Sequence, residues 1–169
     1  MTSFHSALRA IRQPAAILGA AALLSLAACN SAPEAPASET AASEAGGLTV
    51  TNARLVLAPV SGNPAAVYFD LSYAGSGDVT LAGVTVEGAG MTMVHQTVEK
   101  DGAMAMMGAD PIALTKGANV VFAPGGLHVM AMEPSADWSP GGTVNVTLTL
   151  SDGTTYSFPA TVRAAGEAR

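Results

Sequence analysis

The chain has 169 residues, which suits one domain of ordinary size with appendages. Only 12% of the residues are charged, whereas 18 are glycine and 10 are proline, a balance that favours a turn-rich all-β domain over a helical bundle. The formal net charge of −6 argues against a nucleic-acid partner, because phosphate binding needs clustered Lys and Arg residues.

Residues 1–28 have the pattern of an export signal. Arg9 and Arg12 give a positive start, and the apolar segment 14–28 is shorter than the span of about 20 residues that crosses a membrane. The segment ends in LAAC, whose Cys29 is the only cysteine of the chain. This ending resembles the bacterial lipobox, in which the peptidase cuts before the Cys and the Cys receives acyl chains. The resemblance implies a lipoprotein anchored to a membrane through Cys29, and the alternative is an ordinary secretory leader with a chance Cys behind its cleavage site.

Residues 29–47 comprise this Cys and a segment without large apolar side chains, which predicts a disordered linker between membrane and domain. Asn30 stands where an Asp favours inner-membrane retention in some Gram-negative bacteria, so a periplasmic location on the outer membrane is favoured. A single cysteine also excludes an internal disulfide bond and, once lipidated, leaves no thiolate for chemistry.

From residue 48 to residue 163, short strand-like segments alternate with turn sequences such as SGNP, KDG, APGG and SDG. No segment shows a convincing helical period. Roughly eight or nine strands in about 115 residues predict an all-β Greek-key sandwich or barrel, with residues 164–169 as a short tail. The predicted strands lie in segments 48–59, 65–75, 78–90, 91–99, 103–108, 119–126, 127–133, 143–153 and 155–162.

Methionine and histidine gather in one part of this domain. Every Met apart from Met1 lies between Met91 and Met132, and the only histidines after the leader are His95 and His128. Side chains two residues apart share one face of a strand. Three segments therefore present soft donors on one face each: Met91, Met93 and His95; Met104 and Met106; and His128, Met130 and Met132.

The turn sequence at Asp101 and Gly102 predicts a hairpin that joins the first two of these segments. With a loop of two, three or four residues, His95 lies opposite residue 108, 107 or 106 respectively. In every register Met106 is opposite His95 or within two positions of it, which is close enough for both side chains to reach one ion.

Imidazole and thioether donors together select a soft metal ion. Ca²⁺ and Mg²⁺ prefer oxygen ligands, and Zn²⁺ takes thiolate, imidazole or carboxylate, so copper, above all Cu(I), is the ion that remains. A single methionine on a strand is nevertheless more often a core residue, and Met107, which faces away from Met106, is predicted to lie in the core. The alternative interpretation is therefore a β-sandwich surface lipoprotein whose Met-rich face is core or a protein-interaction patch.

The spacing of four of these residues adds a family resemblance. Ten residues separate His95 from Met106, twenty-one separate Met106 from His128, and one separates His128 from Met130. This spacing, together with the flanking words MVHQTVEKDGAMAMM and FAPGGLHVMAME, resembles the PCuAC family of periplasmic copper chaperones over most of residues 48–162.

The resemblance implies a cupredoxin-like β-barrel that holds Cu(I) through His95, Met106, His128 and Met130, with Met104 as an auxiliary candidate. It also implies that copper passes to the Cu(A) centre of cytochrome oxidase, directly or through a thiol-bearing assembly protein. The chain departs from some members because it lacks a His- and Met-rich C-terminal tail, so a second, Cu(II) site is in doubt.

Catalysis is not predicted, because no nucleophile triad, phosphate loop or paired-carboxylate site is recognisable in the sequence. A blue-copper electron-transfer site is disfavoured, because it needs a Cys thiolate with two His ligands. The sequence therefore predicts a copper-transfer protein and not an enzyme.

Overall fold

The computed structural model describes residues 43–167, which contain strands and turns and no helix that could cross a membrane. This confirms the all-β prediction. The predicted signal peptide, Cys29 and the linker up to residue 42 lie outside the described residues.

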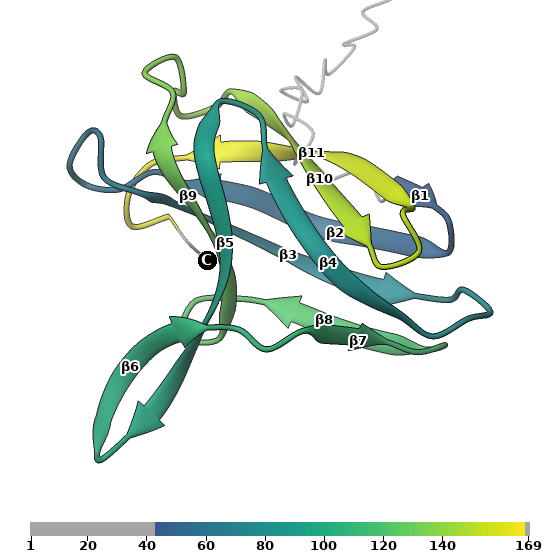
Figure 1. Cartoon of the computed structure of the whole chain (residues 1–169). Helices are drawn as coiled ribbons and strands as arrows, with labels where there is room; N and C mark the ends of the chain where they lie inside the picture. Colours follow the sequence, from purple (N-terminus) through teal and green to yellow (C-terminus); the bar gives the residue numbers. More distant parts are fainter. Residues whose placement is uncertain (1–42, 168–169) are drawn as a thin grey trace, which may run out of the picture. The chain divides into compact units, whose positions relative to one another are not determined.

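One sheet of eleven strands makes up the domain (Figure 1). Along the sheet the order is β6-β5-β9-β8-β3-β2-β11-β10-β4-β7, with β1 added to β2 and a further pairing between β9 and β3. Neighbouring strands are antiparallel except for the β2–β11 and β8–β9 pairs. The strands are β1 (Ser43–Ala45), β2 (Leu48–Val56), β3 (Ala65–Tyr73), β4 (Val79–Val86), β5 (Ala89–Lys100), β6 (Ala103–Gly108), β7 (Ile112–Leu114), β8 (Ala118–Phe122), β9 (Leu127–Pro134), β10 (Thr143–Leu150) and β11 (Thr155–Arg163).

The sheet curves back on itself. β4 and β5 lie near opposite ends of the strand order, yet the Thr92 hydroxyl on β5 donates a hydrogen bond to the Val84 carbonyl on β4. In Figure 1, β5 crosses over beside β4 on the side of the domain opposite to β2 and β3. The curvature encloses one apolar interior between the strands.

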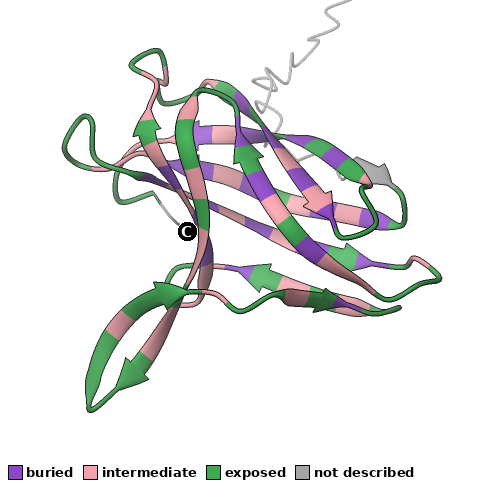
Figure 2. Ribbon diagram, in the orientation of Figure 1, coloured by how far each residue is buried: buried purple, intermediate pink, exposed green. Residues whose placement is uncertain are grey.

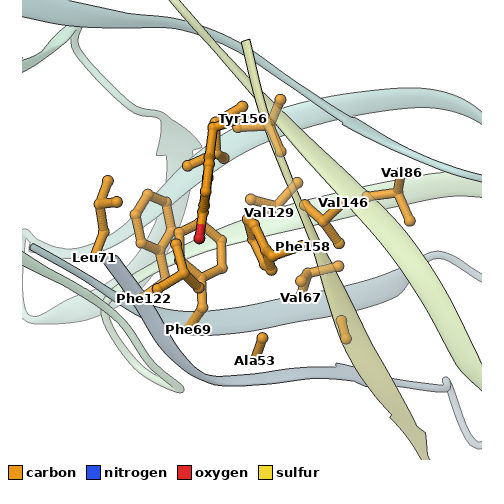
Figure 3. Close-up of a cluster of buried hydrophobic side chains, with 14 of the residues drawn as sticks. Ala53, Val67, Phe69, Leu71, Val86, Phe122, Val129, Val146, Tyr156 and Phe158 are labelled. Carbon is orange, nitrogen blue, oxygen red and sulfur yellow. The ribbon is translucent and has the colours of Figure 1, made fainter. Parts of the chain in front are cut away.

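Alternation of apolar side chains builds this interior. Every second residue of β3 from Ala65 to Tyr73 is buried, and β10 and β11 follow the same period. Phe69 lies beside Phe122 in Figure 3; the two rings are stacked with centroids 4.2 Å apart, and Phe158 meets the Phe69 ring edge-on at 5.2 Å. Aromatic pairs in these geometries add to the free energy gained by burial, so the core fixes β3, β8 and β11 together.

Two short strands escape the sequence prediction. β1 pairs in backbone register with Leu48–Val50, so residues 43–45, which the sequence analysis places at the end of the linker, form a strand. β7 pairs with β4, although three residues are too few to show a period in the sequence. Backbone hydrogen bonds to an existing strand create both elements, and side-chain patterns do not report such bonds.

The β5–β6 hairpin extends beyond the rest of the sheet. Pairing between β5 and β9 ends at Gln96 opposite Leu127, and the remainder of β5 pairs only with β6. Figure 2 shows this hairpin as almost entirely exposed or half-buried. His95 therefore lies at the base of the hairpin, where the hairpin joins the packed domain.

Candidate metal centre

His95 and His128 lie directly opposite each other on neighbouring strands. They are direct partners in the antiparallel pairing of β5 with β9, and their ring centroids lie 6.0 Å apart with the ring planes at 88°. Side chains directly opposite each other share one face of a sheet. The structure thus brings together two residues that are separated by more than thirty positions in the sequence.

Burial of His128 is unusual for its residue type. Its exposed fraction is 4%, and it is the only buried polar or charged residue among those described. Its Nδ1 lies 3.0 Å from the carbonyl oxygen of Gly126. A carbonyl oxygen can only accept, so Nδ1–H is the donor and, in the neutral ring, Nε2 carries a free lone pair. A hydrogen bond that orients the ring in this way is the usual support of a metal-binding histidine.

Two buried ring nitrogens have no hydrogen-bond partner: Nε2 of His128 and Nδ1 of His95. Leaving a buried polar group unpaired costs about 1–3 kcal/mol, and native structures rarely keep such groups without a reason. A metal ion between the rings would satisfy both lone pairs. The residues present therefore fit a metal centre.

A tight turn sets the position of His128. Gly126 N–H donates to the Ala123 carbonyl at 3.0 Å, and Gly125 has a φ of 80°. Pro124 at the second position and a positive φ at the third define a type II turn, for which glycine is the favoured third residue. The Gly126 carbonyl also accepts from the backbone N–H of Thr97 at 3.2 Å. One carbonyl group therefore links the β5 backbone to the His128 ring.

The hairpin adopts the first of the three registers predicted from the sequence. Asp101 and Gly102 form its two-residue loop with φ values of 54° and 75°, which are typical of a type I′ turn. His95 consequently lies opposite Gly108, and Met106 lies opposite Thr97, diagonal to His95 on the same face. This confirms that Met106 is within two positions of His95.

Met130 approaches the histidines from the other side. It lies opposite Met93, so it is diagonal to His95 and two positions along β9 from His128. Diagonal neighbours have Cα atoms about 7–8 Å apart, within reach of long side chains. His95, Met106, His128 and Met130 therefore share one face of three adjacent strands, and Met104, opposite Glu99, extends the same face toward the hairpin tip.

The methionines are not core residues. Met106 is 56% exposed, and none of the seven methionines among the described residues is buried. The prediction that Met107 lies in the core is wrong, since its exposed fraction is 49%. Its strand belongs to the projecting hairpin, which has no second layer of protein to cover either face. The alternative interpretation offered two roles for the Met-rich face, core or protein-interaction patch. The exposure of these methionines excludes the core role.

Sequence reasoning missed Tyr68 and Arg54 beside the site. The Tyr68 ring lies 6.5 Å from the His128 ring, and the Arg54 guanidinium lies 5.2 Å from the centre of the Tyr68 ring. Burial raises the pKa of Tyr68, although the positive charge of Arg54 opposes that rise. The two residues come from β2 and β3, and no spacing relative to the His and Met signature could have revealed them.

The donor set restricts which ion fits. Within residues 43–167 no three His, Cys, Asp or Glu side chains lie together as a potential metal site. An ion at the histidine pair must therefore complete its coordination with thioethers or solvent. Neutral imidazole and thioether ligands suit a soft ion such as Cu(I).

Comparison with known proteins places the chain in a family. The family model described as "Putative lipoprotein LpqE-like" matches residues 48–162. The chain is 38% identical over 146 residues to "Putative lipoprotein Lxx21020" of Leifsonia xyli subsp. xyli, an alignment that covers 85% of this chain and 86% of that protein. It is also 29% identical over 90 residues to the uncharacterized protein RP573 of Rickettsia prowazekii, over 53% and 50% of the two chains.

Solved structures share the fold. The copper-bound PCuAC domain of PmoF2 superposes with a TM-score of 0.59 at 23% identity, covering 73% of this chain and 98% of that domain. Apo-DR1885 of Deinococcus radiodurans gives a TM-score of 0.55 at 29% identity over 82% and 93% of the chains. Its Cu(I) form gives 0.51 at 27% identity over 69% and 78%. The chain therefore belongs to the LpqE-like lipoprotein family, and its β domain is of the cupredoxin-like PCuAC type.

Proposed function

We propose that the chain binds one Cu(I) ion as cargo through His95, Met106, His128 and Met130 and acts as a copper chaperone. The observation that carries the proposal is the facing histidine pair, in which Nδ1 of His95 and Nε2 of His128 are buried without partners. The solved structures that share this fold include a copper-bound PCuAC domain and a Cu(I) form of DR1885. These structures support the choice of Cu(I).

Transfer suits this centre better than catalytic turnover. His128 is fixed by the Gly126 carbonyl, whereas Met106 stands on an exposed strand of the hairpin. The neutral ligands form no charged cage around the ion, and a flexible thioether can leave as an incoming ligand arrives. We propose that Met104, farther along the same face, is an auxiliary ligand during exchange.

The partner and the location follow from the same proposal. The export signal would direct the chaperone out of the cytoplasm, and the lipid on Cys29 would tether it to a membrane. It would then act in the periplasm, with the outer membrane favoured. The copper acceptor is the Cu(A) subunit of cytochrome oxidase or a thiol-bearing assembly protein. The lipoprotein names in the family support the anchor.

Anaerobic titration with Cu(I) against a competing chelator tests the metal proposal. We expect the wild-type chain to hold a tightly bound ion that His95→Ala or Met106→Leu releases at chelator concentrations the wild type withstands. Met107→Leu is the matched control, because Met107 is similarly exposed on β6 but faces away from His95. If the wild type does not bind Cu(I), or if His95→Ala leaves the Cu(I) affinity unchanged, the remaining alternative is favoured, which is a protein-interaction patch on a surface lipoprotein.

Fractionation of cells tests the anchor separately. The Cys29→Ala variant should leave the membrane fraction, whereas a conservative change at Asn30 should not release it. A Cys29→Ala protein that stays membrane-bound and fully processed would remove the lipobox interpretation without touching the copper proposal.

A further inference from the structure

Two methionine pairs continue the line of the histidine pair along β5 and β9. Met93 lies opposite Met130, and Met91 lies opposite Met132. Residues two apart on a strand share a face, so these four thioethers lie on the same face as His95. The Cβ atoms of directly opposite residues are about 4.5–5.5 Å apart, and a Met side chain has three rotatable bonds. The sulfur atoms can therefore converge on one ion.

Packing does not account for these methionines. Met91 is 52% exposed and Met93 is 43% exposed. The alternating positions on β9 contribute Val129 and Ala131 to the core, where both are fully buried. The outer face of β5 and β9 thus carries large, flexible side chains at positions that gain little free energy from burial.

The surroundings of the four thioethers offer no anionic ligand from the adjacent strand. On β3 the residue opposite Met130 is Ala66, a small apolar residue that leaves room for the longer side chains. Glu133 follows Met132 in the chain, but its carboxylate occupies the place that a Cβ atom would take at Gly90. Gly90 precedes Met91 on β5, so this place lies on the opposite face of the strand from the Met91 side chain. Uncharged sulfur donors alone exclude hard cations and suit a soft monovalent ion.

We propose that Met91, Met93 and Met132 form a second Cu(I) site next to the His95–His128 centre. Met130 lies between the two sets of donors and belongs to the first site. Met91 and Met93 are exposed, whereas His128 is buried, so copper binds first at the thioethers and then moves inward to the histidine pair. The choice of Cu(I) rests on the proposed function, but the ligands of the second site are separate from those of the first.

The experiment uses the full chain in a nonionic detergent, labelled with ¹³C at the methionine methyl groups and titrated with Ag(I), a redox-inert analogue of Cu(I). The variant is Met91→Leu/Met132→Leu, which removes two thioethers at similar volume on an exposed face and should not disturb the fold. Met107→Leu is the control for loss of an exposed methionine outside the site. His95→Ala removes the first centre and leaves the thioether set intact.

We expect native mass spectrometry to show two Ag(I) ions on the wild type and the control, and one on each of the other variants. The methyl signals of Met91, Met93 and Met132 should shift in His95→Ala, where only the second site remains, whereas Met107 should not move. A wild type that binds one ion, lost in His95→Ala and unaffected by Met91→Leu/Met132→Leu, would overturn the second site and leave the proposed function standing. A wild type that binds no ion would overturn both.

Discussion

His95 and His128 lie opposite each other on antiparallel strands, with their rings nearly perpendicular and 6.0 Å apart. The rings do not satisfy each other, because Nδ1 of His95 and Nε2 of His128 are both buried without a partner. Each such atom costs the empty protein about 1–3 kcal/mol. The arrangement is unfavourable for stability alone, and binding of an ion would offset that cost.

Replacement of His128 by leucine separates stability from copper binding. The change removes the unpaired Nε2, and the Gly126 carbonyl keeps its hydrogen bond from Thr97 N–H. We expect the metal-free His128→Leu protein to be as stable as the wild type or up to about 2 kcal/mol more stable, and to lose Cu(I) binding. Urea unfolding followed by the fluorescence of Trp138 gives the first quantity, and chelator competition gives the second. A strong loss of stability would contradict the unpaired nitrogen as an apo-state cost.

The turn before His128 should control copper affinity through the backbone. Gly125 has a φ of 80°, where an L-residue costs about 1–2 kcal/mol, so Gly125→Ala should destabilise the domain and shift the Gly126 carbonyl that fixes the His128 ring. We expect weaker Cu(I) binding in competition with a chelator. Gly62→Ala is the control, since Gly62 has a similar φ of 84° in the β2–β3 loop. If Gly62→Ala weakened copper binding as much, the specific role of the turn would be wrong.

Tyr68 should make stability depend on alkaline pH. Burial raises the pKa of Tyr68 above its ordinary value of about 10. Above pH 10 the unfolded chain releases this proton before the native protein does, so stability falls as pH rises toward the folded pKa. We expect the wild type to lose stability relative to Tyr68→Phe above pH 10, while the difference between them stays constant from pH 7 to 9. Urea unfolding across this range measures both, and parallel curves above pH 10 would contradict the raised pKa.

Met106 and Met107 test whether copper binding depends on the strand face that a methionine occupies or only on the number of methionines. The two are adjacent on the exposed strand β6, but only Met106 shares the face of His95. Met106→Leu should weaken Cu(I) binding at least tenfold, because a thioether ligand is lost, and Met107→Leu should change it less than twofold. Neither variant should shift the urea midpoint, since both side chains are exposed. Equal effects on copper affinity would indicate that methionine content, and not geometry, determines binding.

The sequence predicted much of this fold because its strands are half-buried. Alternation of buried and exposed residues along β3, β10 and β11 follows directly from the pleat, so pattern and structure coincide there. β1 and β7 were missed because backbone pairing with β2 and β4 defines them, and three residues carry no readable period.

The site shows a similar division. Alternation along one strand is enough to place Met91, Met93 and His95 on one face, and the loop at Asp101 and Gly102 limits His95 to three partners on the hairpin. Only the pairing of β5 with β9 selects His128 as its direct neighbour. Strand pairing over long sequence separations depends on the enclosed core, which no local pattern encodes.

By itself, then, the amino-acid sequence determined the all-β class, the shared faces of the soft donors and the spacing that resembles the copper chaperones. The tertiary structure alone decided that His95 meets His128, that His128 is buried with its Nε2 unpaired, and that Tyr68 lies beside it. The physical reason is that face and period are properties of one strand, whereas burial and a neighbouring side chain require several strands to fold together.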